Sequence, residues 1–229
     1  NHPSGLAIDK SGNLYVADGG TNGVRVVGPG GSVSTPAGFS GAYLVSTNQL
    51  LFRSSAVAID AAGNIYVADA VNNTIRQMPV NGTMTTIAGT PGLSGTTDGT
   101  NNLARFASPS ALVVDGATNL YVTDTTSHTI RKISPSGTNW IVTTVGGWPN
   151  LPGCVEGLGQ NARFNSPQGI AIDGDGTLYI SDSANNIIRI GRVDAGPPVM
   201  LQSIRDAQGI VLAWPVSATG FQLESSTDL

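Results

Sequence analysis

Two aspartates and an arginine recur at fixed distances in four segments of the chain, and residues of these types could serve as acid, base or anion ligand. In each segment a second Asp follows the first by nine residues, a Tyr lies between them, and an Arg follows the second Asp by seven residues. The repeated residues are Asp9, Tyr15, Asp18 and Arg25; Asp60, Tyr66, Asp69 and Arg76; Asp115, Tyr121, Asp124 and Arg131; and Asp173, Tyr179, Asp182 and Arg189. Because an active site is normally assembled only once, this repetition predicts structural roles. We expect the Asp residues to cap turns, the Tyr residues to pack in the core, and the Arg residues to bond backbone carbonyls or the second Asp.

Histidine and cysteine are too few to suggest a metal centre. The chain has two histidines, His2 and His128, and one cysteine, Cys154. Two histidines in separate loop positions do not supply the ligands of a zinc site. The DGDG sequence at 173–176 lacks the spacing and the Glu of an EF-hand loop, and no GxSxG motif marks a hydrolase nucleophile. The sequence therefore predicts no catalytic residue, no metal and no cofactor.

A non-repeated segment, WPNLPGC at 148–154, is the strongest candidate for ligand recognition. Tryptophan is enriched at binding hot spots, so Trp148 and its neighbour Asn150 are candidate ligand-binding residues. The alternative is that Trp148 folds onto its own repeat as a local plug.

Arg105 and Arg163 are the next candidates for ligand binding. Each lies seven residues after an acid, Asp98 or Glu156 respectively. This spacing favours an ion pair that orders the loop over an Arg that is free to bind a ligand.

The elements that must position these residues are short strands. Each segment contains an apolar run that ends in the first Asp, a turn, a second run that contains the Tyr, and a third run that begins near the Arg; a fourth run follows in the first three copies. Four short antiparallel strands per repeat, stacked radially, are typical of a β-propeller blade. The third copy has its glycine at Gly116 instead of two positions later, so we expect that hairpin to differ.

The long connections, 37–54, 90–108 and 147–166, would share one face of the propeller and form its candidate functional face.

The pattern PxGxAxDxxGNxYVADxxNNxIR resembles the NHL repeat, and the segments 3–25, 109–131 and 167–189 match it closely. Two inter-repeat loops, with AlaArgPhe at 104–106 and 162–164, resemble a bacterial variety of this family. The resemblance implies an all-β propeller, usually of six blades. We therefore expect residues 1–192 to form part of a six-bladed propeller, as an open arc or a strained four-blade closure, with the chain being a fragment of a longer protein.

The pattern changes after a linker at 193–198. Residues 199–229 contain three alternating runs that resemble the opening strands of a fibronectin type III-like sandwich, truncated because such a sandwich needs about seven strands.

Composition limits the classes of function. The net charge is −4 and charged residues make up only 11% of the chain, which opposes nucleic-acid binding. No apolar run reaches the ~18 residues that membrane insertion requires. We expect a non-catalytic binding or scaffold module of a secreted or cell-surface bacterial protein, which presents the long-loop face to a protein or glycan ligand. The alternatives are a metal-dependent propeller lactonase or lyase with its site largely in missing blades and, with less support, an RNA-binding NHL domain.

Overall fold

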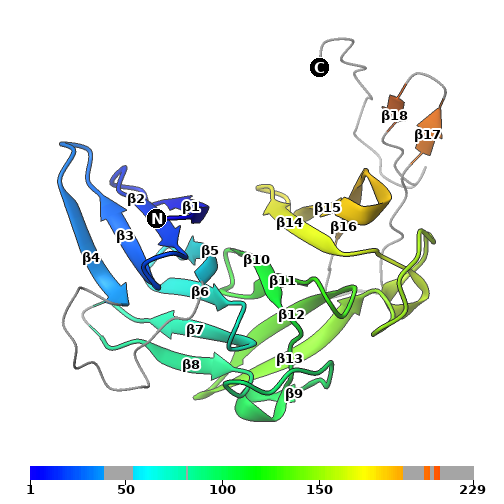
Figure 1. Cartoon of the computed structure of the whole chain (residues 1–229), viewed down its shortest axis with the longest axis horizontal. Coiled ribbons are helices and arrows are strands. Elements are labelled where there is room, and N and C mark those ends of the chain that lie inside the picture. The colour runs from blue at the N-terminus through cyan, green and yellow to red at the C-terminus, as the bar shows by residue number, and fades with distance from the viewer. Residues whose placement is uncertain (39–53, 81, 193–203, 207–208, 212–229) are drawn as a thin grey trace.

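The chain forms an all-β propeller of four antiparallel blades, which confirms the predicted fold class (Figure 1). The computed structural model describes residues 1–38, 54–80, 82–192, 204–206 and 209–211. Each of the first two blades has four strands in sequence order, the third gains a fifth short strand at its outer edge, and the fourth has three. The blades follow one another in an open arc. Neighbouring blades contact each other along their innermost strands, β1, β5, β10 and β14.

The strand bounds follow the repeat. Blade 1 comprises β1 (Pro3–Ile8), β2 (Leu14–Asp18), β3 (Gly23–Val27) and β4 (Val33–Gly38). Blade 2 comprises β5 (Ser54–Ile59), β6 (Ile65–Asp69), β7 (Thr74–Met78) and β8 (Thr85–Ala88). Blade 3 comprises β10 (Pro109–Val114), β11 (Leu120–Asp124), β12 (Thr129–Ser136) and β13 (Asn139–Gly146), with β9 (Gly99–Thr100) paired to β13. Blade 4 comprises β14 (Pro167–Ile172), β15 (Thr177–Asp182) and β16 (Ile187–Arg192). The short 3-10 segments are η1 (Asn101–Leu103), η2 (Gly159–Asn161) and η3 (Ser183–Asn185).

The first Asp of each repeat organises the hairpin between the two inner strands. In the second blade, one carboxylate oxygen of Asp60 accepts the backbone N–H groups of Ala62 and Asn64, both at 2.9 Å. The other oxygen accepts the Asn64 amide at 2.7 Å and the Tyr66 hydroxyl at 3.0 Å. The four tyrosines of the repeats each donate to the first Asp of their own repeat, at 3.0 to 3.2 Å. The same spacing of Asp and Tyr thus recurs in every repeat because both residues belong to one hydrogen-bond network within the hairpin.

The third hairpin does not differ from the others, so the expectation drawn from the displaced glycine is wrong. The Asp115 carboxylate accepts the N–H groups of Ala117 and Asn119, as in the other repeats. The position that Gly63 holds at φ +90° is taken by Thr118 at φ +67°. The Asp-centred network therefore imposes a left-handed conformation even on a β-branched residue, for which it is strained.

The core lies between blades. One face of each blade, formed by small residues and the Tyr, packs against the opposite, larger aliphatic face of the next blade. In the junction between blades 2 and 3, Ala58 and Tyr66 belong to one cluster with Leu112 and Leu120. Among the described residues, none covers the aliphatic face of blade 1 in this way, since Leu6 is 65% exposed whereas its counterpart Leu112 is 4% exposed.

The predicted sandwich region falls mostly outside the described residues, as do the linker at 193–198 and most of the long connection at 37–54. Within 199–229, β17 (Ile204–Asp206) and β18 (Gly209–Val211) form an antiparallel pair. Among the described residues, no helix has the length and apolar character that crossing a bilayer demands.

Candidate functional site

The second Asp and the Arg of the repeat are buried together between the strands and the long loops. The side chains of Arg131 and Asp124 are both fully buried, and Arg131 Nη1 lies 3.3 Å from Asp124 Oδ2. Arg131 also donates to the backbone carbonyls of Arg105 and Thr97, at 2.8 and 3.1 Å. Its guanidinium lies 5.1 Å from the ring centroid of Phe106. The Arg is therefore the point at which the long loop is fixed to the blade.

Blade 4 repeats this arrangement. Arg189 is fully buried, lies 3.6 Å from Asp182, and stacks at 4.9 Å over Phe164. It also donates to the backbone carbonyl of Val155 at 2.8 Å. In blade 2, Arg76 and Asp69 are likewise buried, with 3.9 Å between the charged atoms.

The acids of the two long loops pair with these buried arginines, so the predicted pairs with Arg105 and Arg163 are wrong. Asp98 lies 2.7 Å from Arg131 Nη2, and Glu156 lies 3.4 Å from Arg189 Nη2. The buried guanidinium groups of Arg131 and Arg189 belong to strands that follow the loops in the chain. Their N–H groups need hydrogen-bond acceptors inside the protein. Asp98 and Glu156 each pair with one of these nitrogens, Nη2, because desolvated charges require partners.

Burial also perturbs the acids of the repeat. Desolvation raises the pKa of Asp124 to about 6, against the opposing effects of Ser127 and Arg131. Burial raises the pKa of Asp182 in the same way. A raised pKa can indicate a catalytic acid. Both side chains are 0% exposed, however, so a substrate cannot reach them in this structure.

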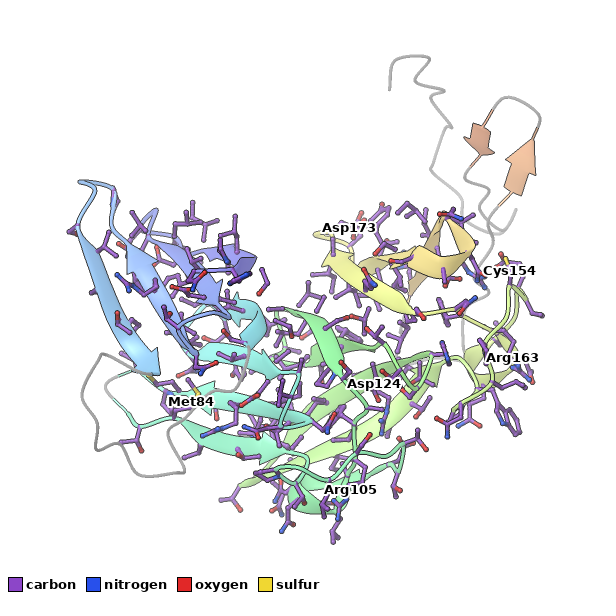
Figure 2. All side chains as sticks on the ribbon, in the orientation of Figure 1. Met84, Arg105, Asp124, Cys154, Arg163 and Asp173 are labelled. Atoms are coloured by element: carbon purple, nitrogen blue, oxygen red, sulfur yellow. The ribbon has the colours of Figure 1, made fainter. Side chains whose placement is uncertain are left out.

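Arg105 and Arg163 lie at the outer rim of the propeller, as does Cys154 (Figure 2). Each arginine donates to carbonyls of its own loop: Arg105 to Ala104 at 2.7 Å, and Arg163 to Ala162 at 2.8 Å. Arg105 bonds the Thr90 hydroxyl at 3.1 Å, whereas the Arg163 guanidinium lies 5.3 Å from the ring centroid of Trp148. The structure thus brings together Arg163 and Trp148 but leaves Arg105 on a different loop.

The loop around Trp148 presents apolar side chains to solvent. Trp148 is 47% exposed, and Leu151 and Val155 are 48% and 50% exposed. Asn150 is also exposed, and its backbone N–H bonds the Ser127 carbonyl at 3.0 Å, which ties the loop to blade 3. We call Trp148, Asn150, Leu151, Val155 and Arg163 the Trp148 surface.

A second feature of the long-loop face was missed by the sequence analysis. A cavity of about 730 Å³ opens where the four innermost strands begin, and its lining includes the second residue of each of them. These four residues are Ser4, Ser55, Ser110 and Gln168. Each is the extra residue of a β-bulge against the neighbouring strand. The signal was present in the sequence, because a polar residue recurs at this position in all four copies.

The three serines at this opening also connect the blades. The hydroxyl of Ser4 donates to the Ser54 carbonyl at 2.8 Å, and that of Ser55 donates to the Pro109 carbonyl at 2.9 Å. The hydroxyl of Ser110 donates to the Gln168 carbonyl at 3.0 Å. Every blade is thereby bonded to the next around the central opening.

The two histidines do not approach each other in the way a metal site would need. His2 lines the central cavity, whereas His128 Nδ1 accepts the Ser166 backbone N–H at 3.0 Å between blades 3 and 4. In the preceding junction the same bond is made by Asn73, whose amide oxygen accepts the Ser108 N–H at 2.8 Å. Within the described ranges, no group of three or more His, Cys, Asp or Glu residues could hold a metal ion.

Comparison with known proteins agrees with this architecture. The NHL repeat model matches residues 1–32 and 164–190. Teneurin-3 of Mus musculus is 29% identical over 228 residues, which cover 86% of this chain but 8% of that protein. Teneurin-4 of Homo sapiens is 27% identical over 83% of this chain and 8% of its own length. The chain thus corresponds to a small part of the curated relatives it matches.

Solved structures share the fold at low sequence identity. A structural genomics protein of unknown function from Bacteroides thetaiotaomicron has a TM-score of 0.68 and 22% identity, over 82% of this chain and 46% of its own. An auxiliary nutrient binding protein from Bacteroides ovatus has a TM-score of 0.64 and 22% identity, over 82% and 47%. The gluconolactonase XC5397 from Xanthomonas campestris has a TM-score of 0.62 and 15% identity, over 90% and 67%. At these identities the similarity concerns the fold alone, which is a β-propeller.

Proposed function

We propose that this propeller is a non-catalytic binding module of a secreted or cell-surface bacterial protein, and that its long-loop face binds a protein or glycan ligand. The observation that carries the proposal is the Trp148 surface. Three large apolar side chains stand exposed on one loop, although burial of such side chains is normally favourable. Exposed apolar patches with a polar rim mark interaction sites.

The composition of the Trp148 surface favours a protein ligand over a glycan. A glycan offers many hydroxyl groups, which would pair poorly with the aliphatic side chains of Leu151 and Val155. A protein ligand could cover both side chains while it stacks on Trp148. Arg163, held beside the indole at 5.3 Å, supplies a charged group at the rim of the patch.

The loop is suited to this role because it is anchored at its base. Glu156 pairs with Arg189, and the Val155 carbonyl accepts a hydrogen bond from the same guanidinium at 2.8 Å. Ordering a loop before the ligand arrives reduces the entropy cost of binding. The exposed side chains are therefore presented by a fixed backbone.

The remaining parts of the proposal concern the parent protein. Richness in Ser, Thr and Asn together with the NHL resemblance supports an extracellular bacterial location. The alternating runs of 199–229, two of which contain the paired strands β17 and β18, support the start of a fibronectin type III-like sandwich after the propeller.

The test is a screen of the chain against arrays of extracellular proteins and of glycans, followed by affinity measurement of each hit. Trp148→Ala combined with Leu151→Ser is expected to weaken binding to a protein hit more than tenfold, because hot-spot side chains each contribute about 2 kcal/mol or more. The matched control is Val80→Ser, a change of a similarly exposed apolar residue on the opposite face, which should leave binding intact.

A hit that binds both variants equally would refute the assignment to the Trp148 surface. Binding to glycans alone would replace the protein ligand by a saccharide. A stoichiometric Ca²⁺ or Zn²⁺ in dialysed protein, found by elemental analysis, would instead favour the enzyme alternative.

A further inference from the structure

A second cavity lies at the outer rim between blades 2 and 3, and residues of the long connection 90–108 form part of its lining. It is an open groove with a volume of about 640 Å³, lined by β7, β8 and residues 89–91 on one side and by η1 and the start of β13 on the other. Figure 1 shows these elements side by side, away from the centre of the arc. The volume is within the range of small-molecule binding sites, about 300–1,000 Å³.

Trp140 forms an aromatic wall of this groove. In the pairing of β12 with β13, Thr143 lies opposite Lys132, and Trp140 precedes Thr143 by three residues. The residues at the equivalent position of blades 1 and 2 are glycines, Gly31 and Gly82. The Trp140 side chain is half-buried and is therefore accessible from the groove. This aromatic residue is specific to the junction between blades 2 and 3.

The indole is held in place from behind. Its ring meets the Tyr66 ring edge-to-face, with centroids 6.0 Å apart and an interplanar angle of 73°. Its backbone N–H donates to the Asn101 side-chain oxygen at 2.6 Å. The Tyr66 hydroxyl is itself held by Asp60 at 3.0 Å. The aromatic wall is thus preorganised, which lowers the cost of binding a ligand.

The rest of the lining is uncharged and mainly polar, with Ile87 and Pro91 as its apolar side chains. Amide side chains come from Gln77, Asn101 and Asn102, and hydroxyl groups come from Thr85 and Thr138. Gln77 Nε2 donates to the Tyr66 hydroxyl at 3.2 Å, which directs the amide toward the aromatic wall. None of the lining residues carries a charge. Such a groove offers both hydrogen-bond donors and acceptors. The Arg105 guanidinium next to it already donates to the Thr90 hydroxyl and the Asn102 carbonyl.

An aromatic face beside amides and hydroxyls suits a neutral saccharide. The C–H face of a pyranose ring is apolar and can pack on the indole, while its hydroxyl groups point sideways to donors and acceptors. We propose that the groove between β8 and β13 binds a short neutral oligosaccharide, with one ring stacked on Trp140 and its hydroxyls bonded to Gln77 and Asn102. This site is separate from the Trp148 surface and does not depend on the function proposed for it.

The experiment measures binding of six neutral oligosaccharides to the whole chain by saturation-transfer NMR and tryptophan fluorescence. The probes are maltohexaose, cellohexaose, laminarihexaose, xylohexaose, mannohexaose and chitohexaose, each titrated to about 10 mM so that a millimolar Kd is detected. We expect saturable binding of at least one probe. Trp140→Ala should weaken it about tenfold, and Trp140→Phe should retain part of it, since a smaller ring still stacks.

Two further variants keep the test independent of folding and of the other site. Asn102→Ala alters an exposed side chain of the groove and should weaken binding several-fold without changing the melting temperature. Trp148→Ala removes the exposed indole of the Trp148 surface and should leave saccharide binding unchanged. The proposal is overturned if no probe binds saturably, or if the bound probe is insensitive to both Trp140→Ala and Asn102→Ala. Loss of binding in Trp148→Ala alone would assign the saccharide to the Trp148 surface and overturn the proposal.

Discussion

Replacing Thr118 by Gly should stabilise the protein, because Thr118 is held in a conformation that its side chain disfavours. In the other three repeats the equivalent position is glycine, at φ +80° to +90°. Thr118 adopts φ +67° with the same hydrogen bonds, including the donation of its N–H to the Asp115 carbonyl at 3.1 Å. The Asp-centred network therefore determines the backbone, and the side chain bears the strain.

The magnitude follows from two opposing effects. A left-handed conformation costs a residue with a Cβ about 1–2 kcal/mol. Glycine loses more backbone entropy on folding, which removes about 0.5–1 kcal/mol of that gain. The expected net stabilisation is about 0.5–1 kcal/mol. For a chain of this size, that corresponds to a rise in Tm of roughly 1–4 °C.

The assay is urea and thermal unfolding of Thr118→Gly beside a reciprocal variant, Gly176→Thr. Gly176 has φ +80°, and no atom lies within 4 Å of the position its Cβ would occupy. The reciprocal variant therefore introduces the same backbone strain with no steric clash, and should lose about 1 kcal/mol. A lower stability of Thr118→Gly, or no loss in Gly176→Thr, would show that the turn does not impose the left-handed conformation.

Three other changes have definite expected outcomes. Burial lowers the pKa of His128 despite the attraction of Asp182. The neutral ring therefore contributes stability that is fully present above the unfolded pKa of about 6.5. This stability is lost as the pH falls from that value through the lower pKa of the folded state. His128→Asn should reduce the loss of stability between about pH 7 and 5.5 in urea titrations, and an unchanged pH profile would contradict this. Asp124→Ala leaves the buried Arg131 without one of its partners and should cost about 3–5 kcal/mol in unfolding free energy, whereas a cost below 1 kcal/mol would mean that Asp98 suffices. Tyr66→Ala should cost about 3–5 kcal/mol in the same measurement, and a much smaller loss would show that the blade interface closes over the cavity.

The sequence predicts the fold well because the repeat encodes local hydrogen bonds. Asp, Asn and Tyr lie within six residues of each other, and the network that joins them forms within one hairpin. A spacing that is set by local contacts can be read directly from the chain. The order of the main strands in each blade therefore follows from the pattern alone, whereas β9, which lies in a long connection, does not.

Contacts between distant segments could not be read in this way. Asp98 and Arg105 are close in sequence, which favoured a local pair. The partner of Asp98 is Arg131, 33 residues away. The Arg131 guanidinium is fully buried and requires a charged partner, whereas Arg105 is only partly buried. The groove at Trp140 was also missed, because its other wall comes from Gln77 in the preceding blade. Residues that occur in one repeat only, such as Trp140, carry no sequence signal of the residue they meet across a blade junction.

The uniform junction between blades has a consequence for how such a chain can grow. Each blade has a face of small residues and Tyr on one side, and a larger aliphatic face on the other that accepts it. A duplicated gene segment that encodes one blade would thus place a matching face against each of its new neighbours. The polar residue of its first strand would also meet the carbonyl of the next blade, as Ser55 meets Pro109. Lengthening of the array by duplication requires no new interface, and the loops of the added copy are free to acquire a ligand of their own.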